Sequence, residues 1–176
     1  MPELSGEAKG EWRPMVPSDL PQVLAVAKEV HPAFPEDAEV FAERLCLYTA
    51  GCLVFHAGRT IAGYVISHPW RAKDPPALNS YLGELPRRPE TYYIHDLALL
   101  SGLRGTGAAS LAVSQVLVRA GKERLATVSL VAVNDSAGFW VRHGFRAIPL
   151  DEIGDVTLMR KLHGYSKAAS FMVRQF

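Results

Sequence analysis

The segment from residue 91 to residue 133 constrains the fold more than any other part of the chain. An apolar, strand-like run ends near Leu100, and the turn S-G-L-R-G-T-G follows it. A helix that is apolar on most sides is expected over residues 108–120, and a second apolar strand over residues 125–133. Because a helix joins these two strands, they can pair in parallel. A helix with so little polar surface has to be covered on more than one side.

The rest of the chain predicts further elements of the same sheet. Strands are expected over residues 12–15, 52–56, 60–67, 145–148 and 156–162, and helices over residues 18–30, 40–48 and 136–143. The tripeptide A-G-R at residues 57–59 reads as a hairpin, so part of the sheet is antiparallel. The fold class expected is therefore α/β, with a mixed sheet and helices on both faces.

One domain is expected, with a core over about residues 11–162. Residues 1–10 are polar and should be frayed. The C-terminal tail, residues 163–176, mixes aromatic and charged residues and either packs back or meets a partner chain, so a homodimer is possible. The long, proline-rich connection over residues 69–90 is a candidate functional loop.

The composition argues against several classes of protein. A net charge of +1 does not indicate a protein that binds nucleic acid in general. No apolar run reaches membrane length, and no secretory leader is recognisable, so a cytoplasmic protein is expected. Cys46 and Cys52 lack metal-ligand spacing and are expected to be buried thiols. No metal is therefore expected.

The glycine turn before the second helix has two interpretations. A helix N-terminus carries unpaired N–H groups and a partial positive charge, and glycines let a ligand approach the backbone closely. With Arg104 beside it, the turn could bind a phosphate. Alternatively, it is a tight turn with a surface arginine. It matches neither the Walker A pattern nor G-x-G-x-x-G.

Two stretches resemble the GNAT acetyltransferases. H-D-L-A-L-L-S-G-L-R-G-T-G-A-A-S, residues 95–110, is similar to their acetyl-CoA signature, Arg/Gln-x-x-Gly-x-Gly/Ala. V-N-D-S-A-G-F-W-V-R-H-G-F, residues 133–145, is similar to their later motif, an asparagine, a short helix with an aromatic pair and then Gly-Phe. The order of elements fits over roughly residues 11–162. The resemblance implies the GNAT fold, with a mostly antiparallel sheet in which two parallel strands splay apart.

The resemblance also implies how acetyl-CoA is held. The pyrophosphate would meet the turn, and the pantetheine arm would lie in the splay beside the strand. The residues implied at the turn are Arg104, Gly105, Thr106, Gly107, Ala108 and Ala109, and those implied on the strand are Leu97, Ala98 and Leu99. Asn134 would contact the arm from the other side; alternatively, it caps the short helix.

Acyl transfer to an amine needs a base and an oxyanion donor. His95 is the candidate base, because its ordinary pKa suits proton removal near neutrality; alternatively, it is a hydrogen-bonded core histidine. Asp96 could hold the ammonium or pair with a nearby N–H. Side chains alternate along a strand. His95 is therefore expected to share a face with Tyr93 and Leu97, with Asp96 on the opposite face.

Trp140 departs from the family pattern, because many members have a tyrosine acid there. An indole N–H is no acid at neutral pH, so Trp140 is expected to pack beside the pantetheine. Tyr93, Trp70 and Tyr81 are candidates for contact with the acceptor.

Two functions follow from the resemblance. One is an N-acetyltransferase that acts on a small molecule, an amino acid or a peptide, through direct attack in a ternary complex. The other is a CoA-binding module without turnover. Neither interpretation involves nucleic acid or a membrane.

Overall fold

The computed structural model describes residues 9–153 and 155–176. Residues 1–8, part of the segment expected to be frayed, lie outside the described residues. The strands are β1 (Glu11–Pro14), β2 (Cys52–Ala57), β3 (Thr60–Trp70), β4 (Thr91–Leu99), β5 (Thr127–Ala132), β6 (Arg146–Ala147) and β7 (Ser170–Gln175). The α-helices are α1 (Leu20–Val30), α2 (Ala38–Leu47), α3 (Ala108–Lys122), α4 (Ala137–Arg142), α5 (Leu150–Ile153) and α6 (Val156–Tyr165).

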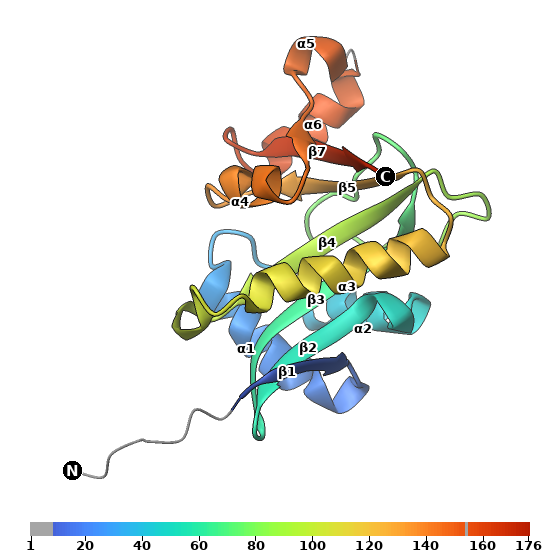
Figure 1. The fold of residues 1–176 in the computed structure, drawn as a ribbon. Helices are drawn as coiled ribbons and strands as arrows, with labels where there is room; N and C mark the ends of the chain where they lie inside the picture. The colour runs from blue at the N-terminus through green and yellow to red at the C-terminus, as the bar shows by residue number, and fades with distance from the viewer. Residues whose placement is uncertain (1–8, 154) are drawn as a thin grey trace.

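The strands form a seven-stranded sheet in the order β1-β2-β3-β4-β5-β7-β6 (Figure 1). Neighbouring strands are antiparallel, except for the parallel pair β4 and β5 that α3 connects. This arrangement confirms the α/β fold class and the mixed, mostly antiparallel sheet expected from the sequence.

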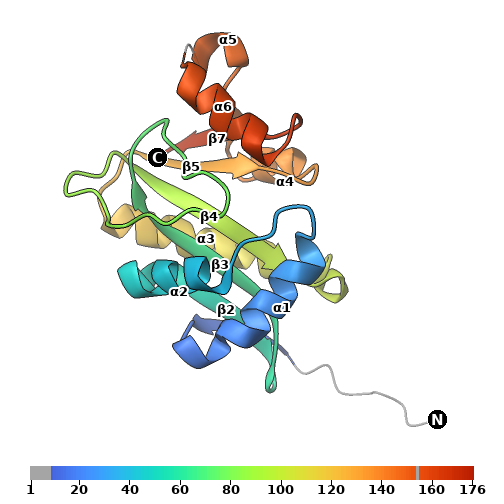
Figure 2. The same cartoon turned by 180° about the vertical axis from the view of Figure 1, so that it is seen from behind.

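Helices cover both faces of the sheet, as Figures 1 and 2 show. On one face, Val113 and Val116 of α3 share a buried cluster with Ile94 and Leu130. The expectation that α3 is covered on more than one side is only partly met, because Val118 is 62% exposed.

The opposite face carries α1 and α2. Val23 of α1 and Phe41 and Leu45 of α2 pack with Tyr64 and Ile66 of β3. A separate, smaller cluster lies between α6 and β7. The connection between α1 and α2 and the end of α6 therefore come to the same side of β4 (Figure 2).

Two irregularities in β4 create the space for a site. The ladder between β4 and β5 ends at the pair Ile94 and Leu130, although both strands continue beyond it. The register with β3 also shifts, because Asp96 pairs with Ile66 whereas Ile94 pairs with Ser67. One residue, His95, is therefore left over in β4, which is the arrangement of a β-bulge.

The prediction of a strand over residues 156–162 is wrong, because this segment is the first part of α6. Leu158 and Leu162, four residues apart, are both buried on one helical side. Asp155 caps the helix, since its side chain accepts hydrogen bonds from the amides of Thr157 and Leu158.

The C-terminal tail packs back, because Ser170–Gln175 form β7 between β5 and β6. The two cysteines differ from each other. Cys52 is buried as expected, whereas the expectation for Cys46 is wrong because this residue is exposed.

Candidate active site

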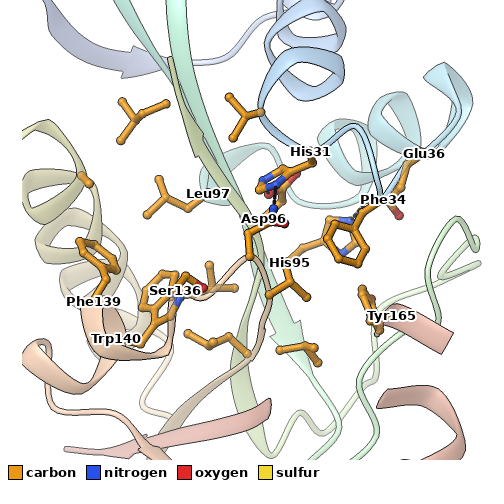
Figure 3. A pocket seen from close by; sticks show the side chains of 18 of the residues that line it. His31, Phe34, Glu36, His95, Asp96, Leu97, Ser136, Phe139, Trp140 and Tyr165 are labelled. Carbon is orange, nitrogen blue, oxygen red and sulfur yellow. Dashed lines mark hydrogen bonds and ion pairs between the residues drawn. The ribbon is translucent and has the colours of Figure 1, made fainter. Parts of the chain in front are cut away.

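A cavity of about 390 Å³ lies where β4 and β5 separate (Figure 3). Several residues predicted from the sequence line it. They are His95, Asp96, Leu97, Leu99, Arg104, Ala109, Asn134 and Trp140. Ala98 lies elsewhere, because it is buried in the cluster under α1 and α2.

The bulge brings His95 and Asp96 to the same cavity. Leu97 belongs to the cluster on the α3 face together with Tyr92 and Ile94. The predicted alternation, with Leu97 beside His95 and Asp96 opposite them, is therefore wrong, since the extra residue resets the alternation after His95. Figure 3 shows the His95 and Asp96 side chains next to each other in the cavity.

His95 is held by a carboxylate from the connection between α1 and α2. Its Nε2 lies 2.8 Å from Oε1 of Glu36, and the two side chains are only 3% and 7% exposed. In the neutral tautomer that donates Nε2–H to Glu36, Nδ1 is the acceptor nitrogen of the ring. Nδ1 is buried without a partner among the described residues.

Glu36 remains a carboxylate despite its burial. Burial alone would raise the pKa of Glu36, but attraction to the protonated form of His95 and the hydrogen bond with that residue outweigh it, so the pKa lies below its ordinary value. Its Oε2 accepts a hydrogen bond of 3.0 Å from the amide of Asn79, in the connection between β3 and β4. Glu36 thus joins this connection to His95.

Asp96 lies at the centre of a second polar group. The hydroxyl of Tyr64 donates a hydrogen bond to it, and Nε2 of His31 lies 2.9 Å from its Oδ1. Nδ1 of His31 is 2.9 Å from Nδ2 of Asn134. Burial would lower the pKa of His31, but the adjacent Asp96 outweighs it, and that pKa lies above its ordinary value.

The alternative interpretation of Asn134, as a helix cap, is excluded. The N-cap of α4 is Ser136, and no side chain caps that helix end. The amide of Asn134 instead reaches across the cavity to His31, 103 positions away in the sequence.

The glycine turn has the backbone that a phosphate site requires. Gly105 and Gly107 have φ angles of 76° and 83°, in the left-handed region that favours glycine. A Cβ atom at either position would meet open space. Gly107 precedes the first turn of α3, where the leading amides lack intrahelical acceptors. Thr106, Gly107 and Ala108 also line a second hollow of about 660 Å³.

Aromatic side chains form the end of the cavity nearest to α4. Trp140 is 7% exposed and packs edge-on against Phe139 and Phe145, with ring centroids 5.0 and 5.4 Å apart. No hydrogen bond of its indole nitrogen is found in the described part of the chain. Trp140 therefore combines core packing with contact to the cavity.

The three residues predicted to contact the acceptor lie outside this cavity. Tyr93 is 1% exposed and packs against His68. Trp70 is at the end of β3, where its indole donates a hydrogen bond of 2.7 Å to the carbonyl of Asp74. Tyr81 is 65% exposed, away from the cavity wall. Strand β3 extends to Trp70, beyond its predicted end at residue 67. The connection between β3 and β4 leaves Tyr81 exposed to solvent.

Sequence reasoning missed several residues of the site. These are His31, Phe34, Glu36, Leu78 and Tyr165, which line the cavity, and Tyr64, which bonds Asp96. The H-P-A-F-P-E stretch at residues 31–36, which follows the end of α1, could have indicated His31 and Glu36, because it places a histidine and a glutamate between two helices.

Residues 9–153 and 155–176 contain neither a metal-binding cluster nor a membrane-spanning helix. No group of three or more His, Cys, Asp or Glu side chains there is arranged to hold a metal ion. No helix in the same residues has both the length and the apolar character needed to cross a membrane.

One family model matches most of the chain. The model of a family described as "Acetyltransferase (GNAT) family" matches residues 20–145. No curated protein matches the chain by sequence.

Solved structures share the fold at low sequence identity. The loading GNATL domain of CurA from Lyngbya majuscula superimposes with a TM-score of 0.75 at 12% identity, covering 95% of this chain and 98% of that one. The GNAT-like decarboxylase GphF in complex with isobutyryl-CoA gives 0.74 at 17% identity, with 94% and 98% covered. Arabidopsis thaliana Naa50 with the bisubstrate analogue CoA-Ac-MVNAL gives 0.67 at 13%, with 95% and 99% covered.

Proposed function

Because the chain belongs to the GNAT acetyltransferase family, we propose that it transfers the acetyl group of acetyl-CoA to a primary amine in a ternary complex. Acetyl-CoA would supply the acyl group as a thioester. The observation that carries the proposal is the buried Glu36–His95 pair, which lines a cavity that extends to Arg104 at the glycine turn. The cavity thus reaches Arg104 and Ala109, which stand on either side of the glycine turn.

Residues of the splay would hold the co-substrate. The open approach to Gly105 and Gly107 suits a pyrophosphate at the N-terminus of α3. β4 beyond Ile94 has no partner on the β5 side, so its backbone is available to the pantetheine arm. The apolar rings of Phe139 and Trp140 would pack along the same arm.

His95 would prepare the acceptor for attack. Nδ1 takes a proton from the ammonium, directly or through a water, and Glu36 stabilises the imidazolium that forms. The amine nitrogen then bonds to the thioester carbon, and a backbone amide near Leu97 donates to the developing oxyanion. The C–S bond breaks, CoA leaves as a thiolate, and the remaining extra proton on the former amine nitrogen passes to water or to the departed thiolate, which leaves a neutral amide.

The thiolate can leave without a protein acid. An ordinary thiol has a pKa near 8.5, so an unprotonated exit is not prohibitive. Tyr165 lines the cavity, but its hydroxyl donates 2.8 Å to the carbonyl of Pro76, and burial raises its pKa above the ordinary value. Trp140 is no acid at neutral pH.

Release of free thiol from acetyl-CoA, measured with a mixed panel of primary amines, tests the proposal. Steady release with any amine is the expected result. Calorimetry with CoA runs alongside it. Tight binding of CoA without release from any amine would contradict the proposal and support a CoA-binding module instead.

Variants of Trp140 are expected to separate packing from proton donation. Trp140→Phe keeps an aromatic body in contact with Phe139 and Phe145 and should retain most of the turnover. Trp140→Ala should destabilise the fold by about 3–5 kcal/mol, the usual cost of such a truncation, and weaken CoA binding. Thermal unfolding, calorimetry and thiol release measure the three effects.

A chemical role for the indole N–H would give a different pattern. Trp140→Phe would then lower turnover as much as Trp140→Ala, with both proteins folded by circular dichroism. The rate of the wild-type enzyme at high pH tests a separate point, the presence of a tyrosine acid, which would impose a fall near pH 10 that a tryptophan cannot cause.

A further inference from the structure

We infer that the acceptor is a compact amine cation with an apolar body and no carboxylate. This inference rests on the proposed acetyl transfer and narrows its acceptor from small molecules, amino acids and peptides to one chemical class. It is carried by the end of the cavity beyond Asp96, where Phe34, Glu36, His95 and Tyr165 gather (Figure 3).

The charges at this end favour a cation. Glu36 and Asp96 line the cavity, and each has a histidine beside it, His95 and His31 respectively. An ammonium group is attracted to these carboxylates, whereas a carboxylate on the acceptor is repelled by them. His31, whose pKa lies above its ordinary value, offsets part of the charge of Asp96, so Glu36 contributes more to this preference. Charge therefore selects for an amine and against an anion.

No arginine or lysine is in place to bind an acceptor carboxylate. Among the described residues, Arg104 is the one such side chain that lines the cavity, and it lies at the glycine turn. Arg44 is close to Glu36 but does not line the cavity, since its guanidinium donates to Glu43 at 2.8 Å and to the carbonyl of Ser80 at 3.0 Å.

The connection between β3 and β4 adds an apolar wall and no charge. Of its residues, only Leu78 lines the cavity. Its cations do not line the cavity: Arg71 stacks on Trp70 at 4.7 Å, and Lys73, Arg87 and Arg88 are exposed. Together with Phe34 and Tyr165, Leu78 would pack against an apolar acceptor body.

The same end is closed to an extended chain. Three segments meet there: the connection between α1 and α2, the connection between β3 and β4, and α6. Hydrogen bonds tie them together, namely Asp37 N to Asn79 Oδ1 at 2.8 Å, Asn79 N to Glu36 Oε2 at 3.0 Å, Asn79 Nδ2 to Asp37 Oδ2 at 3.1 Å, and Tyr165 Oη to the carbonyl of Pro76 at 2.8 Å. Lys161 of α6 also pairs with Asp74. A peptide would have to break these bonds to pass.

Four acceptors related to leucine separate charge from size. They are 3-methylbutylamine, leucinamide, leucine and a pentapeptide amide that begins with leucine. Leucine and leucinamide differ in the carboxylate, and leucinamide and the peptide differ in length. Thiol release should give kcat/KM at least about tenfold higher for 3-methylbutylamine and leucinamide than for leucine, and at least about tenfold higher for leucinamide than for the peptide, which is about 1.4 kcal/mol in each case.

Leu78→Arg tests the wall directly. A cation at this position should raise kcat/KM for leucine relative to leucinamide by about tenfold. Tyr81→Arg adds the same charge to an exposed position of the same connection and should leave the ratio unchanged.

The possible failures are distinguishable. Steady release with leucine or the peptide as fast as with leucinamide would overturn this inference and leave the acetyltransferase in place. An equal change of the ratio in Leu78→Arg and Tyr81→Arg would also overturn it, because the effect would then be one of general charge. Absence of release from every amine would remove the proposed function, and this inference with it.

Discussion

His95→Ala should lower turnover by roughly a hundredfold or more at saturating substrates, the scale of general base catalysis, while the affinity for CoA stays unchanged. The substitution removes an imidazole whose Nδ1 is buried without a hydrogen-bond partner among the described residues. Thiol release measures turnover and calorimetry measures CoA binding. His56→Ala is the control. His56 lies on β2, away from the cavity, so this substitution should leave turnover unchanged.

Two further measurements separate a base from a structural histidine. Added imidazole should restore part of the rate of His95→Ala if a proton acceptor is what the variant lacks. Glu36→Gln keeps the shape of the side chain but removes the charge that stabilises the imidazolium. Its acid limb in the rate–pH profile should move to lower pH, whereas that of the neighbouring control Asp37→Asn should not.

Unchanged turnover of His95→Ala would remove His95 from the mechanism. The proton acceptor would then be Asp96, which lies in the same cavity. A large loss of rate without any imidazole rescue, together with an altered circular dichroism spectrum, would assign His95 to the fold alone.

The parallel pair, the glycine turn and the hairpin are visible in the sequence because each depends on local pattern. Glycines before an apolar helix determine the turn over Gly105 and Gly107, and the helix between two strands determines their direction. The bulge at His95 has no such local cause. It depends on the register with β3, which is set by contacts between strands far apart in sequence.

The misassigned elements have similar physical reasons. Val156 and Thr157 suggest a strand, but burial of Leu158 and Leu162 against Phe171 of β7 decides for a helix. A proline normally ends a central strand. The ladder between β2 and β3 ends at Ile66, so Pro69 lies beyond it, and β3 can continue to Trp70.

The acceptor end of the site could not be predicted from the sequence, for the same kind of reason. Glu36 is 59 positions from His95, and His31 is 103 positions from Asn134. Nothing local relates these residues to their partners. Only the packing of α1 and α2 against the sheet brings them together.

Gly107→Val should weaken CoA binding by about tenfold to a hundredfold. Loss of one charge-assisted hydrogen bond, about 1.5–3 kcal/mol, corresponds to this range. The added side chain would project into the open space in front of the leading amides of α3, where the pyrophosphate is proposed to bind. Isothermal calorimetry with CoA measures the effect without requiring an acceptor.

Backbone strain is the competing explanation, because the φ angle of Gly107 is 83° and valine tolerates that region poorly. Gly58→Val is the matched control. Gly58 has a φ angle of 61°, a Cβ there would also meet open space, and the residue lies in the hairpin between β2 and β3. Both variants should lose stability, but only Gly107→Val should lose CoA affinity. If Gly107→Val binds CoA as tightly as the wild type, or if Gly58→Val loses as much affinity, the pyrophosphate does not bind at this turn.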